Sequence, residues 1–316
     1  MCLCVSFNLQ ECINYNTENG SNIHVAFLDS NKAFDTVWQE GLLYKIHELK
    51  GKIWILMKKM YTGVIGGVFF NGHTSPPFFI KRGIVQGGAL SAKLYLIFIN
   101  DLLNDIESCG YRAVIADLKV NIPTQADDIC LVSTHINGLQ RMISMCEDYS
   151  RKWRFTFSES KSKLVSFSRV KNICKSNDLI LYNCILPYVE EITHVGILLN
   201  RKCNSMSRTE RACSKIKAGV MSLVRSGAHP SALNPLTIAK LVKIKMYPSA
   251  LYGCELWILT KAELIMLERA QHFVVKSIQG FDRKTMTDLC TSLLGWTSIK
   301  GYIDIESFYF LVEYLE

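Results

Sequence analysis

The sequence predicts an α+β fold that gives way to a mainly helical region after about residue 205. Up to about residue 200, short apolar runs with strand spacing alternate with amphipathic segments of helical spacing. Beyond that point long helical patterns follow one another. The 316 residues are 49% hydrophobic and 20% charged, which is ordinary for a globular protein, and this length suggests about two domains.

The α+β part is expected to begin with a buried strand at residues 23–29, an apolar run that ends on Asp29. A long helix is expected at about 90–107, because apolar residues recur there at helical spacing. The acidic pair Asp127-Asp128 interrupts an apolar run at 124–133, which predicts a strand, an acidic turn and a second strand. The remaining predictions for this part are helices at 42–49, 53–61 and 139–153 and strands at 64–70, 78–81, 111–116, 164–167, 179–182 and 193–199.

The helical part is predicted to contain helices at 207–226, 236–247, 261–278 and 302–315. Pro248 lacks a backbone N–H, so we expect it to end or kink the second of these helices. The change of pattern predicts one domain at residues 23–203 and another at 204–316. Residues 1–22 show no clear periodicity.

The net charge of +8 is concentrated in two basic segments. Residues 151–175 carry eight lysines and arginines against one acid, and residues 201–217 carry six against one. Such segments suit a polyanion such as nucleic acid, although taken alone they fit solvated loops and helix faces better.

The twelve cysteines show no zinc-ligand spacing, and no secretory signal is recognisable. Free thiols in a reducing, intracellular compartment are the plain interpretation, in the nucleus, the cytoplasm or both. The purely apolar stretches, such as residues 94–99, are too short to span a bilayer, so no membrane partner is expected.

Three carboxylates form the most informative pattern. Asp127-Asp128 lies between apolar runs, and Asp29 ends an apolar strand upstream. Strands that deliver carboxylates to one point suit a site that holds divalent metal ions over phosphate.

Five motifs, in order, resemble the reverse transcriptase domain of LINE-type (non-LTR) retrotransposons. Residues 27–37 read FLDSNKAFDTV, residues 83–102 read GIVQGGALSAKLYLIFINDL, and residues 125–128 read QADD. Looser matches follow at Ser158 to Ser162 and at His194-Val195-Gly196. The region around residues 251–257 also resembles the segment that follows the palm in this family.

This resemblance implies a right-hand polymerase palm with a split β-α-β, ferredoxin-like antiparallel sheet at 23–203. A helical thumb and C-terminal extension would occupy 204–316, and residues 1–22 would be a remnant of the fingers or an unstructured lead. The implied function is that of an RNA-directed DNA polymerase. It would use an RNA template, a DNA primer and deoxynucleoside triphosphates, with two Mg²⁺ ions, or Mn²⁺ in their place. The oligomeric state stays open.

The resemblance also assigns roles to residues at the site. Asp29, Asp127 and Asp128 would hold the metal ions, with the Ser30 carbonyl as a further ligand. The alternative for the aspartates is that they cap turns and bind nothing. Lys161 would protonate the leaving pyrophosphate, or be a phosphate contact or a solvated lysine.

Phe34 would exclude a ribose 2′-hydroxyl, or be an ordinary core residue. Gln86 and Gly87 would contact the incoming nucleotide and template, or form a plain turn before a helix. Basic residues of the two basic segments would contact nucleic acid, and the candidates are Arg151, Lys152, Arg154, Lys163, Arg208 and Arg211.

The sequence departs from the family pattern at Gln125, where a tyrosine is usual, and at Ala92, where a proline is usual. Only a short segment precedes the first predicted strand, so most of the fingers would be missing. Two classes of function therefore compete, an active polymerase and a catalytically inactive fragment that at most binds nucleic acid. A small-molecule enzyme with an acidic metal site would explain the acids but not the Gln-Gly turn or the basic segments.

Overall fold

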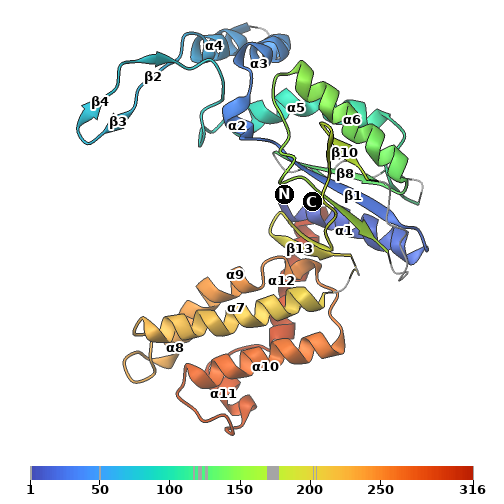
Figure 1. Ribbon diagram of the computed structural model, residues 1–316. Coiled ribbons are helices and arrows are strands. Elements are labelled where there is room, and N and C mark those ends of the chain that lie inside the picture. The colour runs from blue at the N-terminus through green and yellow to red at the C-terminus, as the bar shows by residue number, and fades with distance from the viewer. Residues whose placement is uncertain are drawn as a thin grey trace. The chain divides into compact units, whose positions relative to one another are not determined.

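The computed structural model describes residues 2–49, 51–116, 118–119, 123–124, 127–168, 178–201, 203 and 205–315. The chain divides into two compact units, essentially residues 4–191 and 192–316, and each has its own hydrophobic core (Figure 1). None of the helices in these ranges is long and apolar enough to cross a membrane.

The central sheet of the first unit has the strand order β8–β1–β9 among the described residues. Strand β1 (Ile23–Asp29) lies in the middle, and both β8 (Asp128–Ser133) and β9 (Lys163–Phe167) run antiparallel to it. The two outer strands are therefore parallel to each other. They are connected by helix α6 (Ile136–Lys152), whose polar and apolar positions alternate at helical spacing.

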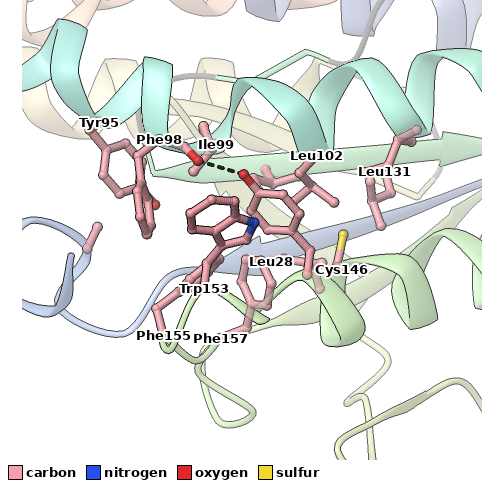
Figure 2. Packing of buried hydrophobic residues seen from close by; sticks show 14 of the residues in the cluster. Leu28, Tyr95, Phe98, Ile99, Leu102, Leu131, Cys146, Trp153, Phe155 and Phe157 are labelled. Carbon is pink, nitrogen blue, oxygen red and sulfur yellow. Dashed lines mark hydrogen bonds between the residues drawn. The ribbon is translucent and has the colours of Figure 1, made fainter. Parts of the chain in front are cut away.

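Helices α5 (Ser91–Ser108) and α6 cover one face of this sheet (Figure 1). Ala26 and Leu28 of β1 contribute to the same core as the buried residues of both helices. Figure 2 shows the aromatic side of this core, where the rings of Phe98 and Trp153 lie 5.8 Å apart. The Tyr149 hydroxyl donates a 2.6 Å hydrogen bond to the Phe98 carbonyl, which ties α6 to α5.

A lysine enters this aromatic core from helix α3 (Gln39–Ile46). The Lys45 side chain is 5% exposed, and its Nζ lies 2.8 Å from Asp101 Oδ2 and 4.0 Å from the centre of the Trp153 ring. Nζ also donates to the Phe98 carbonyl, at 2.6 Å, and to the Tyr149 hydroxyl. Burial lowers the pKa of Lys45, and the neighbouring Asp101 carboxylate opposes that shift.

The first unit holds several shorter elements. The short ladders among the described residues form three hairpins, and Asn71 and Gly72 turn one of them with positive φ at both positions. The elements are α2 (Ala33–Thr36), a 3₁₀ turn (His47–Leu49), α4 (Gly51–Tyr61), β2 (Ile65–Gly66), β3 (Phe69–Phe70), β4 (His73–Thr74), β5 (Phe78–Phe79), β6 (Val114–Ile115), β7 (Leu118–Lys119), β10 (Ile180–Leu181) and β11 (Cys184–Ile185).

The amino-terminal segment forms a helix, α1 (Cys2–Glu18), where the sequence left an unstructured lead as one alternative. Leu9, Cys12 and Ile13 are buried, and α1 lies on the side of the sheet opposite α5 and α6 (Figure 1). Helical periodicity is obscured in this segment because α1 also buries polar side chains such as Asn16, whose amide donates to the Cys12 and Val114 carbonyls.

The second unit begins with the hairpin of β12 (Glu191–His194) and β13 (Ile197–Asn200), where the sequence predicts a single strand. Val195 and Gly196 both have positive φ, +48° and +79°, and make a two-residue turn. A Cβ atom on Gly196 would lie 2.8 Å from the Tyr252 ring, so this turn packs against the helical unit. This contact explains why the compact units divide at 191/192, ahead of the predicted boundary at 203/204.

The rest of the second unit is helical, as the sequence predicts. Just before Pro248 the chain widens into a π-helical turn (Val242–Met246), in which the Tyr247 N–H donates to the Val242 carbonyl. This turn and the short α9 that follows agree with the expected kink or end at Pro248. The elements are α7 (Met206–Arg225), α8 (Pro235–Leu241), the π turn, α9 (Tyr247–Ala250), a 3₁₀ turn (Cys254–Leu256), α10 (Lys261–Ser277), α11 (Thr287–Leu293) and α12 (Ile299–Leu315).

Candidate active site

Two of the predicted carboxylates face each other across the sheet. The register of β1 and β8 pairs Asp29, the last residue of β1, with Asp128, the first residue of β8. Side chains paired in this way have Cβ atoms about 5 Å apart on the same face. Asp127 lies in the turn directly before β8, so the three acids gather at one end of the sheet. The predicted strand before the acids is not formed at residues 123–124, and Gln125 lies outside the described residues.

The acids interact electrostatically. Burial raises the pKa of Asp128, and the charges of Asp127 and Asp29 raise it further, whereas Lys161 lowers it. Lys161 Nζ lies 3.3 Å from Asp29 Oδ2, and the two side chains are 68% and 28% exposed. Asp29 Oδ2 itself is shielded from solvent, and no described donor makes a hydrogen bond of good geometry to it. The site therefore concentrates negative charge that a single exposed lysine offsets.

The loop before β9 holds the backbone of Asp29 in place. The Ser158 N–H donates to the Asp29 carbonyl at 2.7 Å, and the Asp29 N–H donates to the buried Ser162 Oγ at 3.2 Å. One residue further on, the Asn31 N–H donates to the Thr156 carbonyl at 2.9 Å. The loosely matched fourth motif thus contributes Lys161 to the side chain of Asp29 and Ser162 to its backbone.

A tyrosine that the sequence analysis did not single out lies next to the acids. The Tyr95 hydroxyl, on α5, donates to Ser30 Oγ at 3.1 Å, and its ring lies 5.5 Å from that of Phe34. Burial raises the pKa of Tyr95, and the charges of all three aspartates add to that shift. Tyr95 falls on the buried face of α5, four residues after Ser91, and this spacing was the available signal.

Gly83 allows the Gln-Gly loop to lie directly against α2. Its φ is +90°, and a Cβ atom there would lie 3.1 Å from the Asp35 carbonyl oxygen and 3.2 Å from that of Phe34. Across this contact the Ile84 N–H donates to the Phe34 carbonyl, and the Gln86 side chain donates to Asp35 Oδ1 at 2.7 Å. The first two motifs therefore form one substructure, with Gly87 exposed beside it at φ +76°.

The predicted nucleic-acid contacts fall in different environments. Arg151 is 62% exposed and lies 3.3 Å from Glu147 and 3.7 Å from Asp148. Lys152 is exposed at the end of α6, and Arg154 lies over the Trp38 ring at 4.1 Å.

Lys163 begins β9 opposite Phe27. Arg211 is exposed on α7 in the second unit. Arg208, also on α7, is partly buried, and burial lowers its pKa while the Glu263 carboxylate opposes that shift.

The acidic end of the sheet has several properties that suit a metal ion. Among the described residues, no three His, Cys, Asp or Glu side chains are arranged as a ready-made metal site. The shielded Asp29 oxygen without a hydrogen bond and the mutual repulsion at Asp128 are nevertheless features that a divalent cation would relieve. Carboxylate oxygens are also the ligands that Mg²⁺ prefers. The residues present fit such an ion.

Comparisons with known proteins agree with the motifs. Residues 4–199 match the family model described as reverse transcriptase (RNA-dependent DNA polymerase). The RNA-directed DNA polymerase from mobile element jockey of Drosophila funebris is 31% identical over 182 residues, which are 55% of this chain and 19% of that protein. The probable RNA-directed DNA polymerase from transposon X-element of Drosophila melanogaster is 25% identical over 265 residues, which are 80% of this chain and 28% of that protein.

Among solved structures, telomerase from Candida albicans, in complex with a fragment of telomeric RNA, aligns with 92% of this chain and 49% of that chain, at 12% identity and a TM-score of 0.45. The chain thus spans between about a fifth and a third of the length of the mobile-element relatives. The family match covers well over half of the sequence, including all three acids and the motifs at residues 27–37 and 83–102. The chain belongs to the reverse transcriptase family, and it is a reverse transcriptase domain of the LINE (non-LTR) type.

Proposed function

We propose that this chain is the catalytic part of an RNA-directed DNA polymerase, with residues 23–203 as the palm and 204–316 as the thumb and its extension. The observation that carries the proposal is the cross-strand pair of Asp29 and Asp128 with Asp127 in the adjoining turn. The parallel strands β8 and β9, joined by α6 and separated by β1, support a split β-α-β palm. Helix α1 would stand in the place assigned to the fingers remnant.

Asp29, Asp127 and Asp128 would hold two Mg²⁺ ions, or Mn²⁺, with help from the Ser30 carbonyl. When bound, such ions activate an attacking oxygen and neutralise the charge that develops on a leaving pyrophosphate. The contacts of Ser158 and Ser162 keep Asp29 at the end of the sheet, ready to bind a cation. Lys161, exposed and 3.3 Å from Asp29, would move to a phosphate oxygen or donate its proton to the leaving group.

The incoming deoxynucleoside triphosphate would lie beside Phe34 and the Gln86-Gly87 turn. Phe34 packs on Tyr95, which Ser30 holds, so the Phe34 ring has a fixed support from which to exclude a 2′-hydroxyl. Gln86 is held by Asp35, and the exposed Gly87 has no atom near the position of a Cβ. That opening would let the backbone approach a base pair closely.

The basic residues would bind the phosphates of an RNA template and a DNA primer without reading their sequence. Lys152, Arg154, Lys163 and Arg211 are the stronger candidates on exposure or position, whereas Arg151 already faces two carboxylates and Arg208 is partly buried. A polymerase with these partners would act inside the cell, in the nucleus, the cytoplasm or both.

A second candidate is an inactive relic that only binds nucleic acid. The observation in its favour is that no three potential ligands among the described residues are arranged as a metal site. Under this alternative the basic segments keep their role and the three acids are inherited but idle.

Primer extension on an RNA template separates the two candidates. The wild type should extend a DNA primer with deoxynucleotides and Mg²⁺, and Asp127→Asn should lower the rate by about 10³-fold or more, because metal ions contribute several kcal/mol to transition-state stabilisation. Asp178→Asn, which changes an exposed acid outside the site, should retain the rate. A folded wild type that binds primer–template in a salt-dependent way yet extends nothing would establish the inactive alternative.

A further inference from the structure

A concave site in the first unit is lined by none of the three acids. Its volume is about 560 Å³, and it is formed by the start of α3, the end of α4, the segment from β5 to Arg82 and the turn that follows α6. The side chains that matter for its chemistry are aromatic or cationic, namely Trp38, Tyr61, Phe79, Lys81, Arg82 and Arg154. Of these side chains, the function proposed above uses only Arg154, as a contact to nucleic-acid phosphates.

One wall of the cavity is an arginine stacked on a tryptophan. The Arg154 guanidinium lies 4.1 Å from the centre of the Trp38 ring. Arg154 adopts φ +62°, a conformation that a non-glycine residue rarely takes. The indole also lies against α3, where a Cβ atom on Gly41 would lie 2.5 Å from the ring. Backbone conformation and packing therefore present this pair to the cavity in a fixed position.

Other residues of the lining supply charge and an open aromatic face. Lys81 and Arg82 are exposed, and Phe79 keeps 67% of its side chain in solvent. Arg82 forms a β-bridge with Trp38, which fixes its backbone beside the stacked pair. Within the described part of the chain, no carboxylate forms an ion pair with Lys81, Arg82 or Arg154. The lining thus holds three unneutralised cations against one acid, Glu40.

This combination identifies the chemistry of the ligand. Exposed aromatic faces and guanidinium planes stack on bases, and unpaired cations bind the phosphates between them. A base pair inside a duplex hides its faces, so stacking requires unpaired nucleotides. We propose that this cavity binds single-stranded nucleic acid, with Phe79 and the Trp38–Arg154 stack as base platforms and Lys81 and Arg82 as phosphate contacts. This proposal rests on the proposed function in one respect only, namely that the ligand is a nucleic acid.

The test measures binding without catalysis. Fluorescence anisotropy would follow a labelled, unstructured RNA of about 12 nucleotides, within the site size of single-strand binders, and a blunt hairpin duplex, both without Mg²⁺. The protein would carry Asp127→Asn in every sample, so a failure of the polymerase proposal leaves the result unaffected. The variants are the double substitution Lys81→Ala with Arg82→Ala, which removes two exposed cations that have no role in the proposed function, and Phe79→Ala alone. The matched control is Arg141→Ala, an exposed arginine 5.8 Å from the Tyr111 ring and outside the cavity.

The double variant should bind the single strand about tenfold more weakly. The slope of its log binding constant against log salt concentration should become shallower by roughly 1.4, about 0.7 for each charge removed. Phe79→Ala should weaken single-strand binding with no change in salt dependence, and its exposed position means that the variant should still fold. Duplex binding should stay within about twofold for both variants. Equal losses on single strand and duplex, or a double variant that behaves like Arg141→Ala, would overturn the proposal.

Discussion

Two lysine–aspartate ion pairs in the first unit differ in which partner is buried. In the core pair the cation is enclosed, with Lys45 5% exposed and Asp101 58% exposed. In the pair at the acidic end of the sheet the order is reversed, with Lys161 68% exposed and Asp29 28% exposed. An enclosed lysine held by three aromatic rings and a carbonyl is part of the structure, whereas an exposed one can leave its partner. The same two residue types thus serve as a fixed link between helices and as a replaceable counter-ion.

Lys45→Ala should have the largest effect on stability. It removes the lysine stem from the aromatic core, the hydrogen bond to the Phe98 carbonyl and the cation–π contacts, so we expect a loss of about 2–4 kcal/mol in the free energy of unfolding. Urea denaturation followed by tryptophan fluorescence measures this loss. Asp101→Asn, which changes the exposed partner, should cost within about 1 kcal/mol. Equal losses in the two variants would contradict the view that the enclosure of the Lys45 cation contributes more to stability than its ion pair with Asp101.

Ser162→Ala should have an intermediate effect at the acidic end. The Asp29 N–H would lose its buried acceptor, which should cost about 1–2 kcal/mol. Amide hydrogen exchange should speed up at Asp29, while the exposed Ser160→Ala serves as a control that leaves it unchanged. Unaltered exchange at Asp29 in Ser162→Ala would show that the loop does not hold β1 in this way.

Asp128→Asn should stabilise the protein slightly at neutral pH. Because the folded state raises the pKa of Asp128, the ionised carboxylate opposes folding above that pKa, and the opposition is lost as the pH falls through it towards the ordinary value of 3.8. The gain should stay below about 1 kcal/mol, since Asp128 is only partly buried and solvent screens its charge. Urea titrations at several pH values should show the difference between variant and wild type shrinking on acidification. A difference that grew on acidification would reverse the assigned sign.

Lys161→Ala should change stability the least, within about 0.5 kcal/mol, because its ammonium is largely solvated. Its removal should strengthen Mn²⁺ binding, since the lysine and a metal ion compete for Asp29. Isothermal titration with Mn²⁺ measures this change. Lys163→Ala is a suitable control, as a nearby lysine on β9 that forms no ion pair with the acids in the described structure. Weaker Mn²⁺ binding in Lys161→Ala would make the lysine a partner of the metal site and not its competitor.

Local patterns predicted the strand that ends on Asp29 and the longer helices of both units other than α1, because burial and periodicity depend on neighbouring residues. The helices α1, α2 and α11 were not predicted. The pairing of Asp29 with Asp128 is different, since it joins strands separated by some hundred residues of chain. The burial of Lys45 was equally unpredictable from the sequence, because a lysine in an amphipathic helix is usually a surface residue. Only the arrangement of α3, α5 and α6 encloses it.

The contact between the first two motifs has no signal in the local sequence pattern. The positive φ of Gly83 and its close approach to Asp35 depend on the path of the chain after β5. The single strand predicted at 193–199 was wrong for a related reason, because Val195 carries a positive φ that a β-branched residue seldom adopts. Site roles that the resemblance supplied, from Phe34 to Arg211, stay predictions.

The register of β1 against β8 determines both the packing of the core and the pairing of the acids. Because strand side chains alternate between faces, a slip of one residue would move Ala26 and Leu28 out of the core and separate Asp29 from Asp128 at the same time. Among copies of a mobile element, a substitution of Asp127, which lies outside the ladder, could therefore remove the proposed chemistry while the sheet persists. A one-codon deletion within β1 would erase both at once. As such copies accumulate mutations, proteins that fold but have lost activity should consequently be more common than proteins that have lost both.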